Sequence, residues 1–398
     1  MAGTPAAVTC AAPSPTAASA SPLAPLARSL LGAGQGVYVE AADGTVLLSQ
    51  AANRPVHPAS VSKVPTTLAL LRRLGPDHRF TTTFLATGPV RGDTLEGDLL
   101  VASDGDPYFV DENALLVTAR LNALGLRRVT GTLRPRGPFT FDWQPDDDAA
   151  RLRLAMTGQA PPPAWEAVRA LSPGDTAPPA LHIDGLDAQA TDAADPQPLL
   201  VHRSQTLIEL AKQLNDYSNN VFKPLADAAG GAGEVEALAR SAVPAAMRDE
   251  ITLGDGAGTD ARNRLSPRAA VKILRALEQE LERTGHRLVD ILPVAGVDAG
   301  TLHDRLNAPG EAGRVVGKTG TFGDYGASAL VGAMPTRDHG TVYFAILNHG
   351  VPVPVARRRQ DRFVAALLAR LPGMRWDYQP DPRPAVARAL LATAPATH

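Results

Sequence analysis

The sequence predicts an α/β (α+β) fold, a three-layer sandwich in which an antiparallel sheet is flanked by helices and interrupted by a small inserted α+β domain. Strand-like segments near both ends of the chain supply the sheet. Long segments with helical spacing lie between them. A central stretch rich in Pro, Gly and Asp, residues 135–200, has few periodic segments and marks the insertion.

The overall composition excludes several classes of protein. The chain has 398 residues, of which 44% are hydrophobic, and this is enough for two domains or for one domain with an insertion. A net charge of -2 argues against nucleic acid as the main partner. The single cysteine, Cys10, excludes an internal disulfide framework and a cysteine zinc cluster. No segment approaches the ~20 apolar residues that a transmembrane helix needs.

The N-terminal segment is predicted to be a disordered leader. Residues 1–30 begin with a run rich in Ala, Pro, Ser and Thr, which lacks the basic start and apolar centre of a secretion signal. The rest of the chain is divided into a first part of the core (31–87), the inserted domain (88–199), a second part of the core (200–371) and a C-terminal tail (372–398). The Pro/Ala-rich tail is expected to be frayed.

The first part of the core begins with a hairpin. Residues 36–41 and 45–49 have a β-rich pattern, and Asp43-Gly44 between them predicts a primed turn. Residues 62–74 have a helical pattern, but Pro65 is incompatible with a regular α-helix that begins at Ser60, since its ring would meet the carbonyl of Val61 at a cost of ~3 kcal/mol. We therefore expect a kink, or a first turn that is not α-helical.

The other elements follow from periodicity and from turn signals. In the insertion we expect β-structure over 81–103, a helix over 111–124 and a strand over 129–133. Ser266 followed by Pro267 is a strong helix start. The second part of the core is predicted to contain helices over 206–215, 221–229, 266–282 and 361–371, and an antiparallel meander of strands over 314–321, 327–334 and 341–348.

Three short motifs carry the chemistry. Ser60 and Lys63 are three residues apart at a helix start, so the amine can reach back to the hydroxyl and accept its proton. Lys63 is one of only five lysines, and no other lysine follows a serine at this spacing. The only Ser-x-Asn, Ser218 to Asn220, comes next, and Lys318-Thr319-Gly320-Thr321 follows.

The ordered set Ser-x-x-Lys, Ser-x-Asn and Lys-Thr-Gly resembles the penicillin-recognising serine enzymes. The resemblance is closest to the low-molecular-weight penicillin-binding proteins that are D-Ala-D-Ala carboxypeptidases or endopeptidases, the peptidase S13 type. It covers about residues 36–350 and implies a fold of the β-lactamase/transpeptidase-like type. Four further stretches support it: the Asp43-Gly44 hairpin, Gly105-Asp106-Pro107, Asp255-Gly256-Ala257-Gly258 and Leu292 to Asp298.

The resemblance implies a role for each motif residue. Ser60 is the expected nucleophile and Lys63 its base, which requires the pKa of the amine to fall from ~10.4 to ~7–8. A second cation nearby, Lys318, supplies part of that fall by repulsion. Ser218 relays the proton to the leaving amine, and Asn220 holds Lys63 and the substrate amide.

The resemblance also implies how substrate is held. Lys318 and Thr319 receive the terminal carboxylate of the peptide. Gly320 lets the substrate backbone approach closely, and the backbone N–H groups of Ser60 and Thr321 form an oxyanion hole. The expected partners are peptidoglycan peptides, with β-lactams as covalent inhibitors, in the periplasm or outside a bacterium. No metal or other cofactor is expected.

Some residues are given a structural interpretation, and alternatives remain open. Asp255 is expected to hold its own loop, and Lys212, Lys223 and Lys272 are interpreted as surface charges. The middle residue of Ser-x-Asn is Asn219, where the family often has Asp. A β-lactamase or esterase on the same fold is one alternative function, and a non-catalytic cell-wall binding module is another. A single, short insertion leaves the preference for cross-linked substrate open.

Overall fold

The computed structural model describes residues 21–142, 148–185, 195–216, 222–323, 326–383 and 385–393. It confirms the expected sandwich of helices on both faces of an antiparallel sheet. The core sheet has the strand order β13-β14-β15-β1-β2. These strands are β1 (Gly36–Glu40), β2 (Val46–Gln50), β13 (Val316–Phe322), β14 (Ala327–Thr336) and β15 (Gly340–Asn348).

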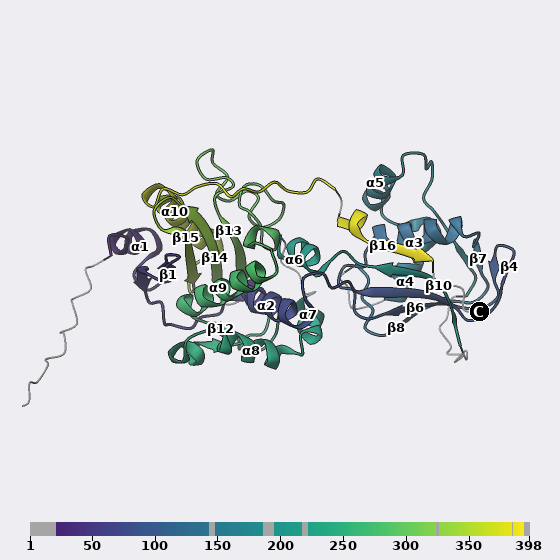
Figure 1. Ribbon diagram of the computed structural model, residues 1–398, viewed down its shortest axis with the longest axis horizontal. Helices are drawn as coiled ribbons and strands as arrows, with labels where there is room; N and C mark the ends of the chain where they lie inside the picture. The colour runs from purple at the N-terminus through teal and green to yellow at the C-terminus, as the bar shows by residue number, and fades with distance from the viewer. Residues whose placement is uncertain are drawn as a thin grey trace, which may run out of the picture.

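Alternate side chains of this sheet fill two separate cores. On one face Val331, Ala345 and Leu347 pack with α2 (Lys63–Leu74) and α9 (Pro267–Arg283). On the other face Leu330 and Ile346 pack with α1 (Ala24–Leu31) and α10 (Val353–Arg370). Successive residues of a strand point to opposite faces, so nearly continuous apolar strands are what two covered faces require. Figure 1 shows this layering, with α1 and α10 to one side of β13–β15 and α9 and α2 to the other.

The helix that carries Lys63 begins as the position of Pro65 predicts. Ala59–Ser62 form a 3₁₀ turn, and the α-helix starts only at Lys63. Pro65 is therefore the third residue of α2, where a backbone N–H has no partner within the helix to lose. The expectation of a first turn that is not α-helical is confirmed.

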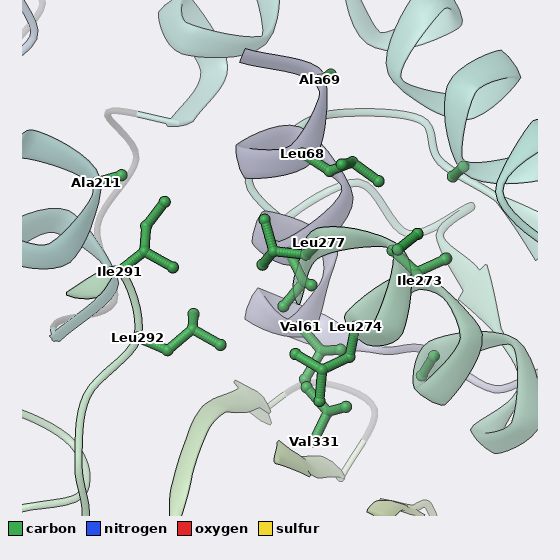
Figure 2. Close-up of a cluster of buried hydrophobic side chains, with 14 of the residues drawn as sticks. Val61, Leu68, Ala69, Ala211, Ile273, Leu274, Leu277, Ile291, Leu292 and Val331 are labelled. Carbon is green, nitrogen blue, oxygen red and sulfur yellow. The ribbon is translucent and has the colours of Figure 1, made fainter. Parts of the chain in front are cut away.

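The core around α2 is built by α9. Ser266 caps α9, because its hydroxyl accepts a hydrogen bond from the N–H of Ala269, and Pro267 is the first helical residue, as predicted. Leu274 and Leu277 of α9 lie against Val61 and Leu68 in Figure 2, which shows part of this apolar cluster. The cluster fixes α2, and with it the 3₁₀ turn, above the sheet.

Two predictions near the N-terminus need correction. Residues 24–31 form α1, whose Ala27 and Leu31 are fully buried, although the span up to residue 30 is predicted to be a disordered leader. Residues 1–20 lie outside the described residues. The primed turn is also wrong: Gly44 donates to the carbonyl of Ala41, and it has a φ of 90° while Asp43 has a negative φ. This pattern is a three-residue loop closed by a glycine bulge, which suits the twist of the hairpin equally well.

A second sheet, with the strand order β16-β10-β3-β6-β8, forms the separate body on the right of Figure 1. A small sheet, β4-β5-β7-β9, adjoins it. The expected strand over 129–133 is wrong, because β7 ends at Val129 and β8 begins at Leu133. The strands are β3 (Thr81–Ala86), β4 (Val90–Arg91), β5 (Thr94–Leu95), β6 (Leu99–Ser103), β7 (Arg128–Val129), β8 (Leu133–Arg136), β9 (His182–Ile183), β10 (Gln197–Arg203) and β16 (Leu390–Thr393).

The helices of the second body are α3 (Asp111–Ala123), α4 (Asp148–Leu154) and α5 (Pro162–Leu171), and those that complete the core are α6 (Leu207–Asp216), α7 (Phe222–Ala228) and α8 (Ala232–Ser241). Of these helices between and beside the sheets, α3, α6 and α7 lie where helices are predicted, whereas α4, α5 and α8 were not predicted. A two-stranded ribbon of β11 (Ile251–Thr252) and β12 (Arg264–Leu265) lies beside α8. Helix α10 begins eight residues before the predicted start, with Pro354 in its first turn. No helix in the described ranges is long and apolar enough to cross a membrane.

The C-terminal segment is not frayed as far as Thr393. After α10 it runs along the core and crosses to the second body, where β16 pairs with β10 (Figure 1, yellow). Arg79 connects the two parts at the crossing, because its guanidinium donates to the carbonyls of Ser204 and Arg388. The proposed domain boundaries at 87/88 and 199/200 stay a prediction, and the pairing of β3 with β10 favours boundaries near 80 and 204.

Candidate active site

Ser60 and Lys63 lie together beneath the surface at the start of α2. The Nζ of Lys63 lies 3.4 Å from the Oγ of Ser60. Ser60 is 6% exposed and Lys63 is 1% exposed. In a 3₁₀ turn, side chains three residues apart lie one above the other, so the turn over Ala59–Ser62 brings the amine over the hydroxyl.

The backbone before Ser60 is strained and closely packed. Ala59 has a φ of 49°, in the left-handed region that residues other than glycine rarely adopt. A Cβ on Gly258 would lie 2.0 Å from the carbonyl oxygen of Ala59, and a Cβ on Gly320 would lie 3.1 Å from the nitrogen of Ser60. Glycine is therefore required at both positions, and strand β13 lies directly against the backbone of Ser60.

His57 holds this strained backbone in place, and the sequence analysis missed it. The N–H of Ala59 donates to Nδ1 of His57 (3.1 Å), and Nε2 donates to the carbonyl of Asp260 (3.0 Å). The imidazole also stacks on Phe322 at the end of β13, with ring centroids 4.2 Å apart. Both ring nitrogens are matched only in the neutral form, and burial lowers the pKa of His57 in favour of that form.

Lys318 places a second amine near that of Lys63. It lies on β13, opposite Val331 of β14, and its side chain is fully buried. Among the described residues its Nζ has no hydrogen-bond partner. Burial lowers the pKa of Lys318 to about 8, against the opposing pull of Asp216. A buried ammonium without a partner is costly, and an anionic ligand would supply the missing contact.

The amine of Lys63 is available as a base near neutral pH. Burial lowers its pKa to about 7, and repulsion from Lys318 adds to the shift, while Asp255 opposes it. The value matches the range expected from the sequence. Lys318 supplies part of the fall, as expected, and burial supplies the larger part.

The loop from Asp255 to Gly258 supports the nucleophile from below. The carboxylate of Asp255 accepts hydrogen bonds from the N–H of Gly258 (2.8 Å) and from the hydroxyl of Thr259 (2.6 Å). The hydroxyl of Thr66 in α2 donates to the carbonyl of Gly256 (2.9 Å), which attaches the loop to the helix. Asp255 thus holds its own loop, as predicted.

Thr319 and Thr321 follow Lys318 along β13 and contact two residues that sequence reasoning missed. The hydroxyl of Thr319 lies 2.7 Å from that of Thr301. The hydroxyl of Thr321 accepts a hydrogen bond from Arg357 of α10 (2.8 Å). Neither Thr301 nor Arg357 belongs to a motif, and only the folded chain brings them to the strand.

Ser218 and Asn220 lie outside the described residues, so their expected roles stay predictions. The residues that flank this stretch belong to the site. The ring centroid of Phe222 lies 5.2 Å from Nζ of Lys63, and Asp216 acts electrostatically on Lys318. Burial raises the pKa of Asp216 to about 7.

Two lysines interpreted as surface charges are partly buried ion-pair partners. Lys212 donates to Asp298 (2.6 Å) and to the carbonyls of Val289 and Leu292. Lys272 donates to Glu40, whose side chain is fully buried. Their partners lie far away in the sequence, and no local pattern marks them. Lys223 is exposed, as predicted.

The arrangement favours nucleophilic chemistry on an anionic substrate. The hydroxyl of Ser60 lies beside the amine of Lys63, which is partly deprotonated near neutral pH. Strand β13, which carries Lys318, passes close to the backbone nitrogen of Ser60. In the part of the chain that the structure describes, no group of three or more His, Cys, Asp or Glu residues is arranged to hold a metal ion.

Comparisons with a family model and with known proteins point to the same family. The family model described as D-Ala-D-Ala carboxypeptidase 3 (S13) matches residues 24–148 and 183–370. Carboxypeptidase DacB of Mycolicibacterium smegmatis is 28% identical over 386 residues, which cover 86% of this chain and 82% of that protein. A D-alanyl-D-alanine carboxypeptidase of an Actinomadura species is 26% identical over 447 residues, covering 85% of this chain and 81% of that protein.

Solved structures share the fold. A predatory endopeptidase of Bdellovibrio bacteriovorus, acylated by penicillin G and bound to an immunity protein, superposes with a TM-score of 0.77 at 23% identity, covering 90% of this chain and 99% of that chain. Penicillin-binding protein 4 of Haemophilus influenzae superposes with a TM-score of 0.62 at 18% identity, covering 88% of this chain and 99% of that chain. At these identities the likeness concerns the fold.

Proposed function

The chain belongs to the D-Ala-D-Ala carboxypeptidase 3 (S13) family of enzymes, and from this membership we propose that it is a serine DD-peptidase. It hydrolyses the D-Ala-D-Ala end, or the D-Ala cross-link, of peptidoglycan peptides through an acyl-Ser60 intermediate. β-Lactams acylate the same hydroxyl. The observation that carries the proposal is the Ser60 hydroxyl, 3.4 Å from the Lys63 amine, near the buried ammonium of Lys318, which has no hydrogen-bond partner among the described residues.

Acylation begins with the transfer of a proton. Lys63, neutral because burial and Lys318 lower its pKa, takes the proton of the Ser60 hydroxyl as the oxygen attacks the carbonyl between the two D-alanines. The carbonyl oxygen becomes an oxyanion, which accepts hydrogen bonds from the N–H groups of Ser60 and Thr321. Each such donor contributes ~3–4 kcal/mol to the stability of the transition state.

The tetrahedral intermediate then collapses. The C–N bond breaks, the leaving amine takes a proton that passes from Lys63 through Ser218, and Asn220 holds the substrate amide. The acyl group stays on Ser60 until water attacks it. Lys63 accepts a proton from that water, and the proton passes to Ser60 as the ester bond breaks.

The carboxylate of the substrate explains the second amine. Lys318 offers it a buried ammonium without a partner among the described residues, and Thr319 offers a hydroxyl on the same strand. Such charge-assisted contacts orient the peptide, which lies along β13 as an added strand. Gly320 lets β13 lie against the turn that carries Ser60, since any side chain there would meet the carbonyl of Pro58.

Two other functions fit parts of the site. A β-lactamase or esterase would release the penicilloyl group from Ser60 quickly, whereas a DD-peptidase keeps it. A non-catalytic cell-wall binding module would bind muropeptides without Lys63. The amine of Lys63 is buried beside the hydroxyl of Ser60, and this arrangement favours catalysis over simple binding. The substrate places the enzyme in the periplasm or outside a bacterium.

The test is the release of D-alanine. Purified protein is incubated with a pentapeptide that ends in D-Ala-D-Ala and with cross-linked muropeptides. The products are separated by chromatography and identified by their mass. We expect free D-alanine or cleaved cross-links from the wild type and none from Ser60→Ala. A folded wild-type protein that cleaves neither substrate would overturn the proposal.

A further inference from the structure

We propose that Thr301 is a positioning residue for the carboxylate end of the substrate, and this inference rests on the proposed function. Thr301 lies in the segment that follows Asp298, outside the three motifs. Its hydroxyl is 2.7 Å from the hydroxyl of Thr319, so the two side chains share a hydrogen bond. Thr301 therefore contacts the one neutral side chain that we assign to the carboxylate.

Substrate binding would fix the direction of this hydrogen bond. A hydroxyl can both donate and accept, so in the free enzyme either oxygen can supply the hydrogen between them. When Thr319 donates its one hydrogen to the substrate carboxylate, its oxygen accepts the hydrogen of Thr301. The second bond polarises the first, so the pair of hydroxyls donates to an anion more strongly than Thr319 alone.

The backbone of Thr301 is held at the end of α6. Its N–H donates to the carbonyl of Asp216 (2.9 Å), which is the last residue of that helix. A Cβ on the preceding Gly300, which has a φ of 93°, would lie 2.0 Å from the same carbonyl oxygen. Only glycine permits this contact. Thr301 thus connects β13, which carries Lys318, to the end of the helix that precedes Ser218.

Thr301 also lines a shallow pocket of about 440 Å³, together with Ala299, Gly300, His303 and Asp304. The terminal carboxylate belongs to the D-alanine that leaves in the proposed reaction. A residue that acts on it through Thr319 therefore acts on the leaving side of the scissile bond and not on the acyl side.

The test compares substrates with and without the carboxylate. Thr301→Val keeps the shape of the side chain and removes the hydroxyl. Steady-state kinetics are measured with a peptide ending in D-Ala-D-Ala and with a chromogenic ester of an N-acyl-D-alanine, which has no terminal carboxylate. We expect KM for the peptide to rise about 5- to 10-fold, the effect of one lost hydrogen bond to an anion-binding group, with kcat changed less than 2-fold. The ratio of kcat/KM for peptide to that for ester falls by the same factor.

Three controls separate this role from a structural one. Thr301→Ser restores the hydroxyl and should restore KM. Thr319→Val combined with Thr301→Val should raise KM no further than Thr319→Val alone. Thr336→Val removes a buried hydroxyl bond at the opposite end of β14, to the carbonyl of Gly340, and should leave KM for the peptide unchanged.

The outcomes are distinct. Equal losses with peptide and ester, or no change with either, would overturn the role of Thr301 while the wild type still releases D-alanine. A wild type that hydrolyses the ester but not the peptide would overturn the proposed function itself.

Discussion

At the scale of single residues, the proposed chemistry depends on the charge of Lys63. The amine is 1% exposed, and its pKa of about 7 lets it accept the proton of Ser60 at neutral pH. An exposed lysine would keep its proton and leave the hydroxyl unactivated. The burial that costs stability is thus the same burial that makes the base.

The first prediction concerns the pH dependence of the reaction. Below about pH 7 Lys63 is protonated and cannot accept a proton, so kcat/KM for a D-Ala-D-Ala peptide should fall about tenfold per pH unit. It should be highest between about pH 7 and 8, and above about pH 8 it should fall again as Lys318 loses the charge that holds the carboxylate. A pH–rate profile of the wild type measures the limb directly. The exposed Lys223 offers a control, since Lys223→Met should leave the limb in place. A limb below pH 5 would mean that another group is the base.

The second prediction concerns stability. The pKa of Lys63 in the folded state lies below that of the unfolded chain, so the unfolded chain binds the extra proton between about pH 7 and 10.5. The stability of the wild type should therefore rise with pH across that window. Lys63→Met removes this contribution and, at pH 7, should raise the free energy of unfolding by up to ~4 kcal/mol while acylation is lost. Denaturant unfolding at several pH values measures both effects. A variant less stable than the wild type at pH 7 would contradict the account.

At the scale of elements, three backbone segments pack so closely around Ser60 that the points of contact require glycine. Gly258 and Gly320 bring a loop and a strand against Ala59 and Ser60. His57 joins the same three segments through two hydrogen bonds and a stacked ring. The position of the nucleophile is therefore set by packing between elements and not by the helix alone.

The third prediction tests this packing. In Gly258→Ala the new Cβ would lie 2.0 Å from the carbonyl of Ala59, at a φ of 89°. Strain and displacement should cost ~1–3 kcal/mol of stability and reduce kcat at least tenfold. Gly233→Ala in α8, where a Cβ meets nothing within 4 Å, is the matched control and should stabilise slightly. If both variants keep wild-type kcat, the close contact with Ala59 has no part in catalysis.

Local patterns identified the elements that depend on local rules. Pro65 required a change of helix type at the place where Ser60 lies, and Ser266-Pro267 located the start of α9. The meander of β13 to β15 followed from apolar runs with short connections. Residues 24–31 and 390–393 were missed because α1 and β16 are stabilised by distant partners, α10 and β10.

In the site, too, local motifs identified some residues, while residues that depend on distant contacts were missed. Ser60, Lys63 and Lys318 belong to short motifs, and the structure brings these three residues together. His57, Thr301 and Arg357 contact the motifs only through folding, and no spacing rule connects Thr301 with Thr319. Lys212 and Lys272 were misread for the same reason, since the acids that bind them, Asp298 and Glu40, are far away in the sequence. Ser218 and Asn220 stay predictions.

At the scale of the whole molecule, two bodies share one chain that crosses between them more than twice. The second sheet takes its strands from the middle of the chain and its outer strand, β16, from the C-terminal end (Figure 1). Arg388, just before β16, pairs with Asp381 and Glu209 near the crossing. The C-terminal segment therefore connects the body that carries the site to the body that does not.

The fourth prediction concerns this connection. Removing residues 385–398 leaves β10 as an edge strand with unpaired backbone groups. Amide exchange in β10 should become faster, while kcat/KM for the peptide changes less than about 3-fold, because no described site residue lies in the segment. Arg388→Ala keeps β16 and removes its flanking ion pairs, and should show a smaller change in exchange. Unchanged exchange in β10 after truncation would show that β16 does not protect it.

One measurement tests the central claim most directly: the location of the acyl group. The wild type, Ser60→Ala and Lys63→Met are incubated with a penicillin, digested and examined by peptide mass mapping. A single penicilloyl group on Ser60 of the wild type, and none on either variant, is the predicted result. An adduct on another residue, or full labelling of Ser60 in folded Lys63→Met, would contradict the claim that a buried lysine activates this serine.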